Sequence, residues 1–349
     1  MSMSTVPKLT RVYPAAAMPG GEIHVVGTGL EAPIRAEIAG VAATVTLSRP
    51  TRLTVRVPEG AGPGEIVVTN GAGRSNGLRV SVGVAMSGSL HPVANPAVDR
   101  AGNVYVTLSG SRGQQTPVSV FRLSRDAEGG FEMRPFVREI LNPTGMAFGP
   151  DGYLYVSSRA EGTVYRVTPD GETSTFAEGL GVATGIAFDR EGALYVGDRS
   201  GTIFKIRPAA HVENLGLFED NEAGLPQETF VFATLEPSMA AYHLAFNAAG
   251  TLFVTGPTTS SNQAIHAIDR DGNATVFFRG LGRAQGMAFD AAGDLLVAAS
   301  WQGERGIVRI TPEGEASIAL AGNDLVGLGL LPDGTAAVVT RDSAYWVVL

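Results

Sequence analysis

Three side chains in the second part of the sequence have the chemistry of catalytic groups: His243, Arg283 and Asp324. A histidine can act as a general base or bind a metal ion, an arginine can hold an anion, and an aspartate can exchange a proton. His243 is distinctive because similar segments of the chain have glycine at the same position, at Gly145 and Gly185. A second interpretation stays open, in which the imidazole only fills space between its neighbours.

These residues belong to a pattern that the chain repeats. The segment NPTGMAFGPDGYLYV, with a strand, a glycine turn and a second strand, returns as GIAFDREGALYV, HLAFNAAGTLFV and GMAFDAAGDLLV. A period of roughly 40–50 residues with four short strands is typical of a β-propeller blade, because one such sheet cannot bury both of its faces alone. The turn glycines of the units are Gly102, Gly152, Gly192, Gly250, Gly293 and Gly334.

The repeat predicts where the strands lie and how the ring closes. The last unit contains only three strands, within residues 326–349, and the β-rich stretch 79–90 has no other partner. We expect part of this stretch to supply the missing outer strand, which removes two open sheet edges. Insertions at 109–117 and 209–227 lengthen two connections. In the unit that starts at Asn142, strands are expected at 145–149, 153–158, 163–168 and 172–177.

Residues 1–83 follow no such period. They contain short alternating strands separated by turns rich in proline and glycine, a pattern that predicts a small β-sandwich. No Ser/Gly-rich linker separates them from residues 84–349, so we expect a fixed docking of the two parts. The sequence therefore predicts an all-β protein with an immunoglobulin-like sandwich at 1–83 and a six-bladed propeller at 84–349.

Both parts resemble known families. Residues 6–83 resemble an IPT/TIG domain, and residues 84–349 resemble NHL-repeat propellers and the related SMP-30/gluconolactonase and streptogramin-lyase-like groups. The resemblance implies these folds, and the propeller families include lactonases, lyases and pure binding proteins. It is carried by Pro14, Gly20-Gly21, Gly27-Thr28-Gly29-Leu30, Val57-Pro58 and Gly64 in the first part, and by Pro143-Thr144-Gly145-Met146-Ala147-Phe148, Asp151-Gly152 and Leu154-Tyr155-Val156 with their repeats in the second.

In a propeller, ligands bind at the mouth of the central channel, where the loops before the innermost strands and after the second strands meet. Polar residues at these positions predict a binding site of mixed charge. The expected ligand-binding residues are Asn95, Asn142, Thr144, Arg159, Thr184, Asp198, Arg199, Tyr242, Gln285, Trp301 and Arg305.

The resemblance to SMP-30 lactonases also implies a divalent metal, held by a Glu, an Asn and an Asp at the starts of innermost strands. The matching positions here are Thr144, Thr184, Tyr242 and Gln285, and none of them is a carboxylate. A divalent cation, Ca or Zn, at the channel mouth would therefore need a looser set of ligands. A zinc site would require several histidines, and few are available at the mouth.

Composition excludes several kinds of partner. The net charge of −8 opposes binding to nucleic acids and to anionic membranes, and the absence of cysteine excludes disulfides and thiol chemistry. We find no apolar run long enough to cross a bilayer and no signal peptide, which predicts a soluble protein that is cytoplasmic, or secreted if a signal was removed.

Two functions remain in competition at this point. The first is recognition of a small or extended ligand at the channel mouth, with a protein partner for the N-terminal domain as a further expectation. The second is a lactonase-like hydrolase or lyase that uses His243 with Asn142, Arg283 and Asp324, and a loosely held divalent metal is a further option for it.

Overall fold

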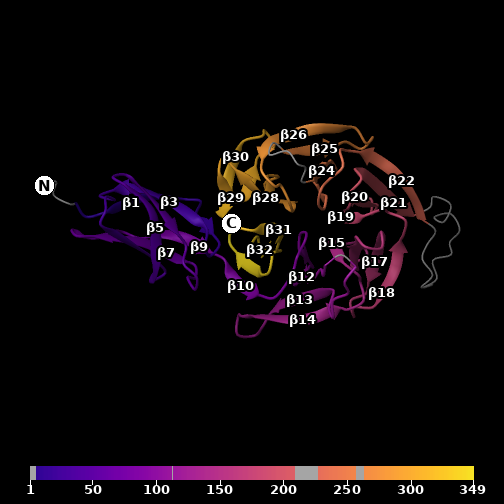
Figure 1. Cartoon of the computed structure of the whole chain (residues 1–349), viewed down its shortest axis with the longest axis horizontal. Coiled ribbons are helices and arrows are strands. Elements are labelled where there is room, and N and C mark those ends of the chain that lie inside the picture. The colour runs from indigo at the N-terminus through magenta and orange to yellow at the C-terminus, as the bar shows by residue number, and fades with distance from the viewer. Residues whose placement is uncertain (1–4, 112, 209–226, 257–262) are drawn as a thin grey trace.

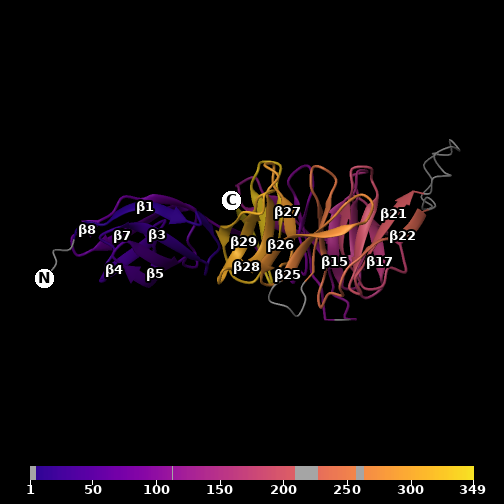
Figure 2. The ribbon, with the colours of Figure 1, turned by 90° about the horizontal axis from the view of Figure 1, so that it is seen from above.

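The computed structural model describes residues 5–111, 113–208, 227–256 and 263–349. Within these ranges all regular elements are β-strands, which confirms the all-β prediction. These residues form no helix of the length and hydropathy that a membrane span requires. The expected insertion at 209–227 lies, except for Gln227, outside the described residues. The strands form two bodies side by side along the longest axis (Figure 1, Figure 2).

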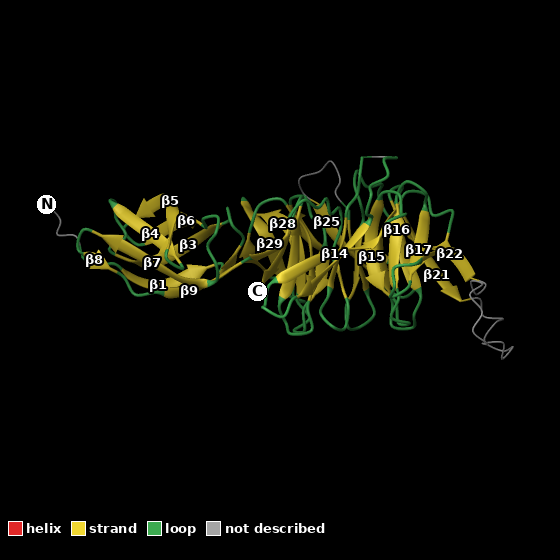
Figure 3. Cartoon of the chain, turned by 90° about the horizontal axis from the view of Figure 1, so that it is seen from below, coloured by secondary structure: helices red, strands yellow, loops and turns green. Residues whose placement is uncertain are grey.

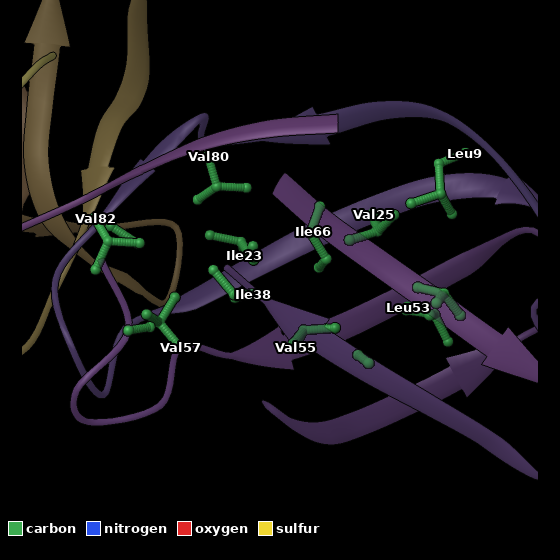
Figure 4. Packing of buried hydrophobic residues seen from close by; sticks show 14 of the residues in the cluster. Leu9, Ile23, Val25, Ile38, Leu53, Val55, Val57, Ile66, Val80 and Val82 are labelled. Atoms are coloured by element: carbon green, nitrogen blue, oxygen red, sulfur yellow. The ribbon is translucent and has the colours of Figure 1, made fainter. Parts of the chain in front are cut away.

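The N-terminal body is a set of antiparallel strands around one hydrophobic core. Its strand order is β1-β3-β6-β5-β4-β7-β9, with β8 paired to β7. Side chains such as Ile23, Leu53 and Ile66 are fully buried and point toward one another between the strands (Figure 4). The strands are β1 (Lys8–Tyr13), β3 (Glu22–Thr28), β4 (Ile34–Ile38), β5 (Val41–Arg49), β6 (Arg52–Arg56), β7 (Gly64–Asn70), β8 (Gly73–Arg74) and β9 (Leu78–Val82).

The second body has a β-propeller arrangement. Among the described residues, five four-stranded antiparallel sheets are separate, and the strands β27–β30 pair in the same sequential order but continue into the N-terminal sheet. We call each of these sets of four a unit. The first units contain β11 (Ala97–Val98), β12 (Val104–Thr107), β13 (Val120–Arg125) and β14 (Phe131–Val137); β15 (Pro143–Phe148), β16 (Leu154–Ser158), β17 (Thr163–Val167) and β18 (Thr173–Ala177); and β19 (Ala183–Phe188), β20 (Leu194–Asp198), β21 (Thr202–Pro208) and β22 (Gln227–Thr234).

The units are arranged around a common axis. Each unit has one innermost strand, and the innermost strands contact one another in the cyclic order β11, β15, β19, β23, β27, β31 and back to β11. Loops gather at the two rims of the ring (Figure 3). The later units contain β23 (His243–Phe246), β24 (Leu252–Thr255), β25 (Gln263–Ile268) and β26 (Ala274–Leu281); β27 (Met287–Phe289), β28 (Leu295–Trp301), β29 (Glu304–Ile310) and β30 (Ala316–Ala321); and β31 (Leu325–Leu330), β32 (Ala336–Thr340) and β33 (Ala344–Val347).

The ring is closed by a strand from the start of the propeller sequence. β10 (Val84–Ser87) pairs antiparallel with β33, with Val84 opposite Trp346 and Ala85 opposite Tyr345. It is the outermost strand of the last unit, whose order is β10-β33-β32-β31. This pairing confirms the closure predicted from the missing fourth strand, and it satisfies the backbone groups of an edge that would otherwise stay open.

The glycine turns have the backbone conformation that the repeat predicts. Gly152 and Gly192 have φ angles of 83° and 88°, a region in which a residue with a Cβ atom is disfavoured. The strands around Gly152, β15 to β18, agree with the ranges expected from the sequence to within two residues at each end.

Neighbouring units are held together by a repeated aromatic contact. An aromatic ring from the second strand of a unit lies between a phenylalanine of its own outermost strand and one from the innermost strand of the next unit. Ring centroids are 4.8–5.2 Å apart and the planes are inclined by 69–87°, the edge-to-face geometry that aromatic quadrupoles favour. The trios are Tyr105 with Phe136 and Phe148, Tyr155 with Phe176 and Phe188, Tyr195 with Phe232 and Phe246, and Phe253 with Phe277 and Phe289.

A short strand joins the two bodies into one sheet. β2 (Ala16–Ala17) lies between β9 and β30 and pairs parallel to both. The amide of Met18 donates to the carbonyl of Ala321 at 2.8 Å, and the amide of Gly83 donates to the carbonyl of Ala17 at 3.0 Å. The expected fixed docking is thus confirmed, since backbone hydrogen bonds connect the bodies directly.

The side chain of Met18 strengthens this junction. It is 2% exposed and belongs to the aliphatic cluster between β27–β30 and the last unit, with Leu296, Leu320 and Leu328. A Cβ atom on Gly322 would lie 2.8 Å from its Cγ, so the space around it is already filled. Met18 therefore contributes to the packing at a junction of two units that has no aromatic trio among the described residues.

We expect Met18→Ala to lower the free energy of unfolding by about 2–5 kcal/mol, because it leaves a cavity in a close-packed cluster. Urea unfolding followed by circular dichroism measures the change. Met133→Ala is the matched control, since Met133 is 36% exposed on β14, and its effect should stay within about 0.5 kcal/mol. Equal effects of the two substitutions would contradict the role given to Met18.

Candidate functional site

A cavity of about 490 Å³ opens at one rim of the propeller, which we call the mouth rim. Much of its lining comes from the starts of innermost strands and the loops before them, and from the loops that follow second strands. Thr144 and Thr184 lie at the starts of β15 and β19, and Arg159 and Arg199 directly follow β16 and β20. The volume is typical of a small-molecule site, and polar groups from several units converge on it.

Eight of the residues predicted from the sequence lie together in this lining. They approach from different units, because the loops of all units meet at the channel mouth. The eight are Thr144, Arg159, Thr184, Arg199, Arg283, Gln285, Arg305 and Asp324.

Two predicted asparagines lie outside the lining and hold the rim together. The amide of Asn95 donates to the carbonyl of Met287 at 2.7 Å, and its oxygen accepts from the amide of Leu328 at 3.1 Å. Asn142 donates to the carbonyls of Gly110 and Ser111 and accepts from the amide of Gly113. Both side chains therefore connect neighbouring units, and their polar atoms are occupied.

Three other predicted residues also lie outside the lining. The carboxylate of Asp198 is buried and accepts from the amide of Val182 at 2.7 Å and from the hydroxyl of Ser200. The hydroxyl of Tyr242 donates to the carbonyl of Glu236, and burial raises the pKa of this phenol to about 12. Trp301 is partly buried and packs on the hydrophobic cluster of β28 and β29.

His243 is sealed within the ring. It is the first residue of β23, lies opposite Thr255 and is 4% exposed. Burial lowers the pKa of its imidazole to about 4, so the ring is neutral at pH 7. Glycine stands at this position in neighbouring units because the innermost strands approach closely: a Cβ atom on Gly145 would lie 2.4 Å from the carbonyl oxygen of Thr184.

The lining includes residues that were not predicted as binding residues. Arg341 follows the last residue of β32, just as Arg159 follows β16 and Arg199 follows β20. This repeated position was visible in the aligned units. Ser300 occupies this same repeated position in its own unit, whereas the segments 92–93 and 239–241 lie outside the repeated pattern and gave no comparable signal.

Arg283 and Asp324 share an unusual backbone geometry. Their φ angles are 48° and 54°, and Asn142 has a φ of 45° at the equivalent position of its unit. Each of the three residues stands three positions before the glycine that begins the repeated Gly-x-x-x segment of the innermost strand. Non-glycine residues adopt this left-handed region rarely. In Arg283 and Asp324 it accompanies side chains that reach the cavity.

The lining is basic. It contains Arg159, Arg199, Arg283, Arg305 and Arg341, against the single carboxylate of Asp324. The cavity is therefore predominantly basic, whereas a site of mixed charge was expected at the mouth and the whole chain has a net charge of −8.

The residues present do not fit a divalent cation of the lactonase type. Among the described residues, no group of three or more His, Asp or Glu side chains comes together as a set of metal ligands. The cavity offers one carboxylate surrounded by guanidinium groups, which repel a cation. The expectation of Ca or Zn at the mouth stays a prediction tied to the hydrolase alternative.

Comparisons with known proteins establish the fold. No protein-family model matches the sequence, and no curated protein matches it. Among solved structures, auxiliary nutrient binding proteins from Bacteroides thetaiotaomicron and Bacteroides ovatus are similar, each with a TM-score of 0.55 and 12% identity. The matches cover 98% and 99% of this chain and 97% and 98% of those chains. A gluconolactonase from Xanthomonas campestris has a TM-score of 0.55 and 13% identity, over 75% of this chain and 88% of its own.

The buried imidazole predicts a pH dependence of stability. In the unfolded chain His243 binds a proton near pH 6.5, but the folded chain binds it only near pH 4, so stability falls as the pH falls between these values. The loss amounts to about 1.4 kcal/mol per pH unit. We expect the drop in unfolding free energy from pH 7 to pH 5 to be about 2 kcal/mol smaller in His243→Gln. Urea unfolding at both pH values tests this, and equal drops in the two proteins would contradict it.

Proposed function

We propose that this protein is a ligand-binding β-propeller that recognises a small or extended ligand at the mouth rim. The observation that carries the proposal is the cavity itself, in which polar side chains from several units converge on one volume. The similar fold of two nutrient binding proteins over almost the whole chain supports it at the level of architecture.

We further propose the domain organisation that the sequence suggested. Residues 1–83 form an IPT/TIG-like domain, supported by the antiparallel strands around a separate core. Residues 84–349 form an NHL-like propeller of six blades, with β27–β30 as the blade that continues into the N-terminal sheet. In this organisation, the surface of the N-terminal domain away from β2 is available to a protein partner.

A lactonase-like hydrolase is the second candidate. In its favour are the fold shared with a gluconolactonase and the presence of Arg283 and Asp324 in one cavity. His243 could take part only after an opening of the ring, since the imidazole is buried outside the lining. The recognition function needs no such rearrangement and is therefore preferred.

Two measurements on the purified full chain separate the candidates. A thermal-shift screen of sugars, organic acids, amino acids and phosphate esters should give a hit whose binding is weakened at least tenfold by Ser300→Ala, which removes a partly exposed hydroxyl from the lining. Metal analysis and a lactone and ester hydrolysis assay, with and without EDTA, should show no EDTA-sensitive turnover.

The control for the screen is Ser174→Ala, which removes a hydroxyl from an exposed residue of the outermost strand β18 and should leave binding unchanged. Bound stoichiometric metal with EDTA-sensitive turnover would overturn the recognition function. Turnover that persists in His243→Ala would remove this histidine from the hydrolase alternative.

A further inference from the structure

The arginines of the cavity are unusual because acidic residues stand beside three of them in the sequence. Arg199 follows Asp198, Arg305 follows Glu304, and Arg341 precedes Asp342. Adjacent opposite charges suggest local neutralisation, yet none of these three acids belongs to the lining.

Each of these acids is engaged away from the cavity. Glu304 binds His24 of the N-terminal body, with 2.8 Å between Oε1 and Nε2, and Asp198 accepts from the amide of Val182. Asp342 accepts from the hydroxyls of Thr340 and Ser343, both at 3.1 Å. The fold therefore directs the carboxylates elsewhere and leaves the guanidinium groups at the cavity.

Among the described residues, four of the five cavity arginines form no ion pair with a carboxylate. These four are Arg199, Arg283, Arg305 and Arg341. Arg199 donates to the carbonyl of Met239 at 2.9 Å, which fixes its guanidinium without neutralising it. Like charges gathered around one concave volume repel each other, and a bound anion removes that repulsion.

We propose that the cavity binds a small molecule that carries at least two anionic groups, such as carboxylates or phosphates. The planar guanidinium group offers paired N–H donors that match both kinds of anion. Arg199 and Arg341 belong to the units of β19 and β31, which are opposite in the cyclic order of the six innermost strands, so they favour anionic groups at both ends of the ligand. Gln285 and Ser300 line the same cavity and offer uncharged polar groups to the body of such a ligand. This inference rests on the proposed ligand-binding function and specifies its ligand class.

Isothermal titration calorimetry with defined probes tests the inference. Citrate represents polycarboxylates, inositol hexakisphosphate represents phosphate esters, and myo-inositol is the uncharged match of the latter. We expect at least one of the anions to bind, with affinity that falls as NaCl rises from 50 to 300 mM, and no binding of myo-inositol. The anion that binds more tightly identifies the carboxylate or the phosphate as the preferred group.

The variants Arg283→Gln and Arg341→Gln should each weaken binding of that anion at least tenfold. Arg190→Gln is the matched control, because it removes the same charge from an exposed arginine in the turn between β19 and β20, at the opposite rim. Without ligand, the melting temperatures of the two cavity variants should equal or exceed that of the native chain, since each removes repulsion. This readout separates a binding role from a structural one.

The outcomes are distinguishable. Equal weakening by Arg190→Gln would show general attraction to the protein surface and overturn the inference. Failure of both anions to bind would also overturn it, and a neutral hit from the thermal-shift screen would then leave the proposed function standing. Failure of the anions together with an empty screen would overturn both.

Discussion

The structure depends on the face-to-face burial of neighbouring propeller sheets, and the edge-to-face aromatic contacts are its most regular expression. One ring of each trio contacts its own outermost strand and the innermost strand of the next unit, so a single side chain fixes both the packing within a sheet and the angle between sheets. Tyr155 also donates from its hydroxyl to Asp151 in the adjacent turn, at 2.8 Å. The mouth loops of Arg159, Arg199 and Arg283 inherit their positions from this packing, because each of them begins or ends on a strand that the trios hold.

Within the described residues, the four trios leave two junctions of the ring without such a contact. Between β27–β30 and the last unit, Leu296 and Leu330 take the place of aromatic rings, and Met18 from the N-terminal body packs in the same aliphatic cluster. The N-terminal body is thus part of the packing of the propeller. The same body also binds Glu304 through His24, which keeps this carboxylate away from the basic cavity. Docking and the electrostatics of the site are therefore coupled.

The all-β fold and the propeller arrangement could be predicted from the sequence because the repeat is local. The turn glycines, the alternation within strands and the missing fourth strand predicted β15–β18 and the closure by β10. The site was predicted in part, since Thr144, Arg199 and Asp324 occupy repeated positions in the mouth loops. Its charge could not be predicted, because it depends on long-range contacts: His24 and Glu304 are 280 residues apart in the chain. Burial of His243 likewise follows from how closely neighbouring units approach.

The pairing of β10 with β33 has a consequence for biosynthesis. On the ribosome, β10 is made early, whereas β33, which covers it, is among the later segments to emerge. β2 also lacks a partner along one edge at this stage, because its partner β9 is synthesised soon after it but its other partner, β30, is synthesised much later. While the middle of the propeller is being translated, the nascent polypeptide therefore presents two unsatisfied edges near its beginning. Such edges attract other strands. The short length of β2 and β10 limits this hazard. Because β30 and β33 are synthesised after most of the propeller, completion of the ring is a late step.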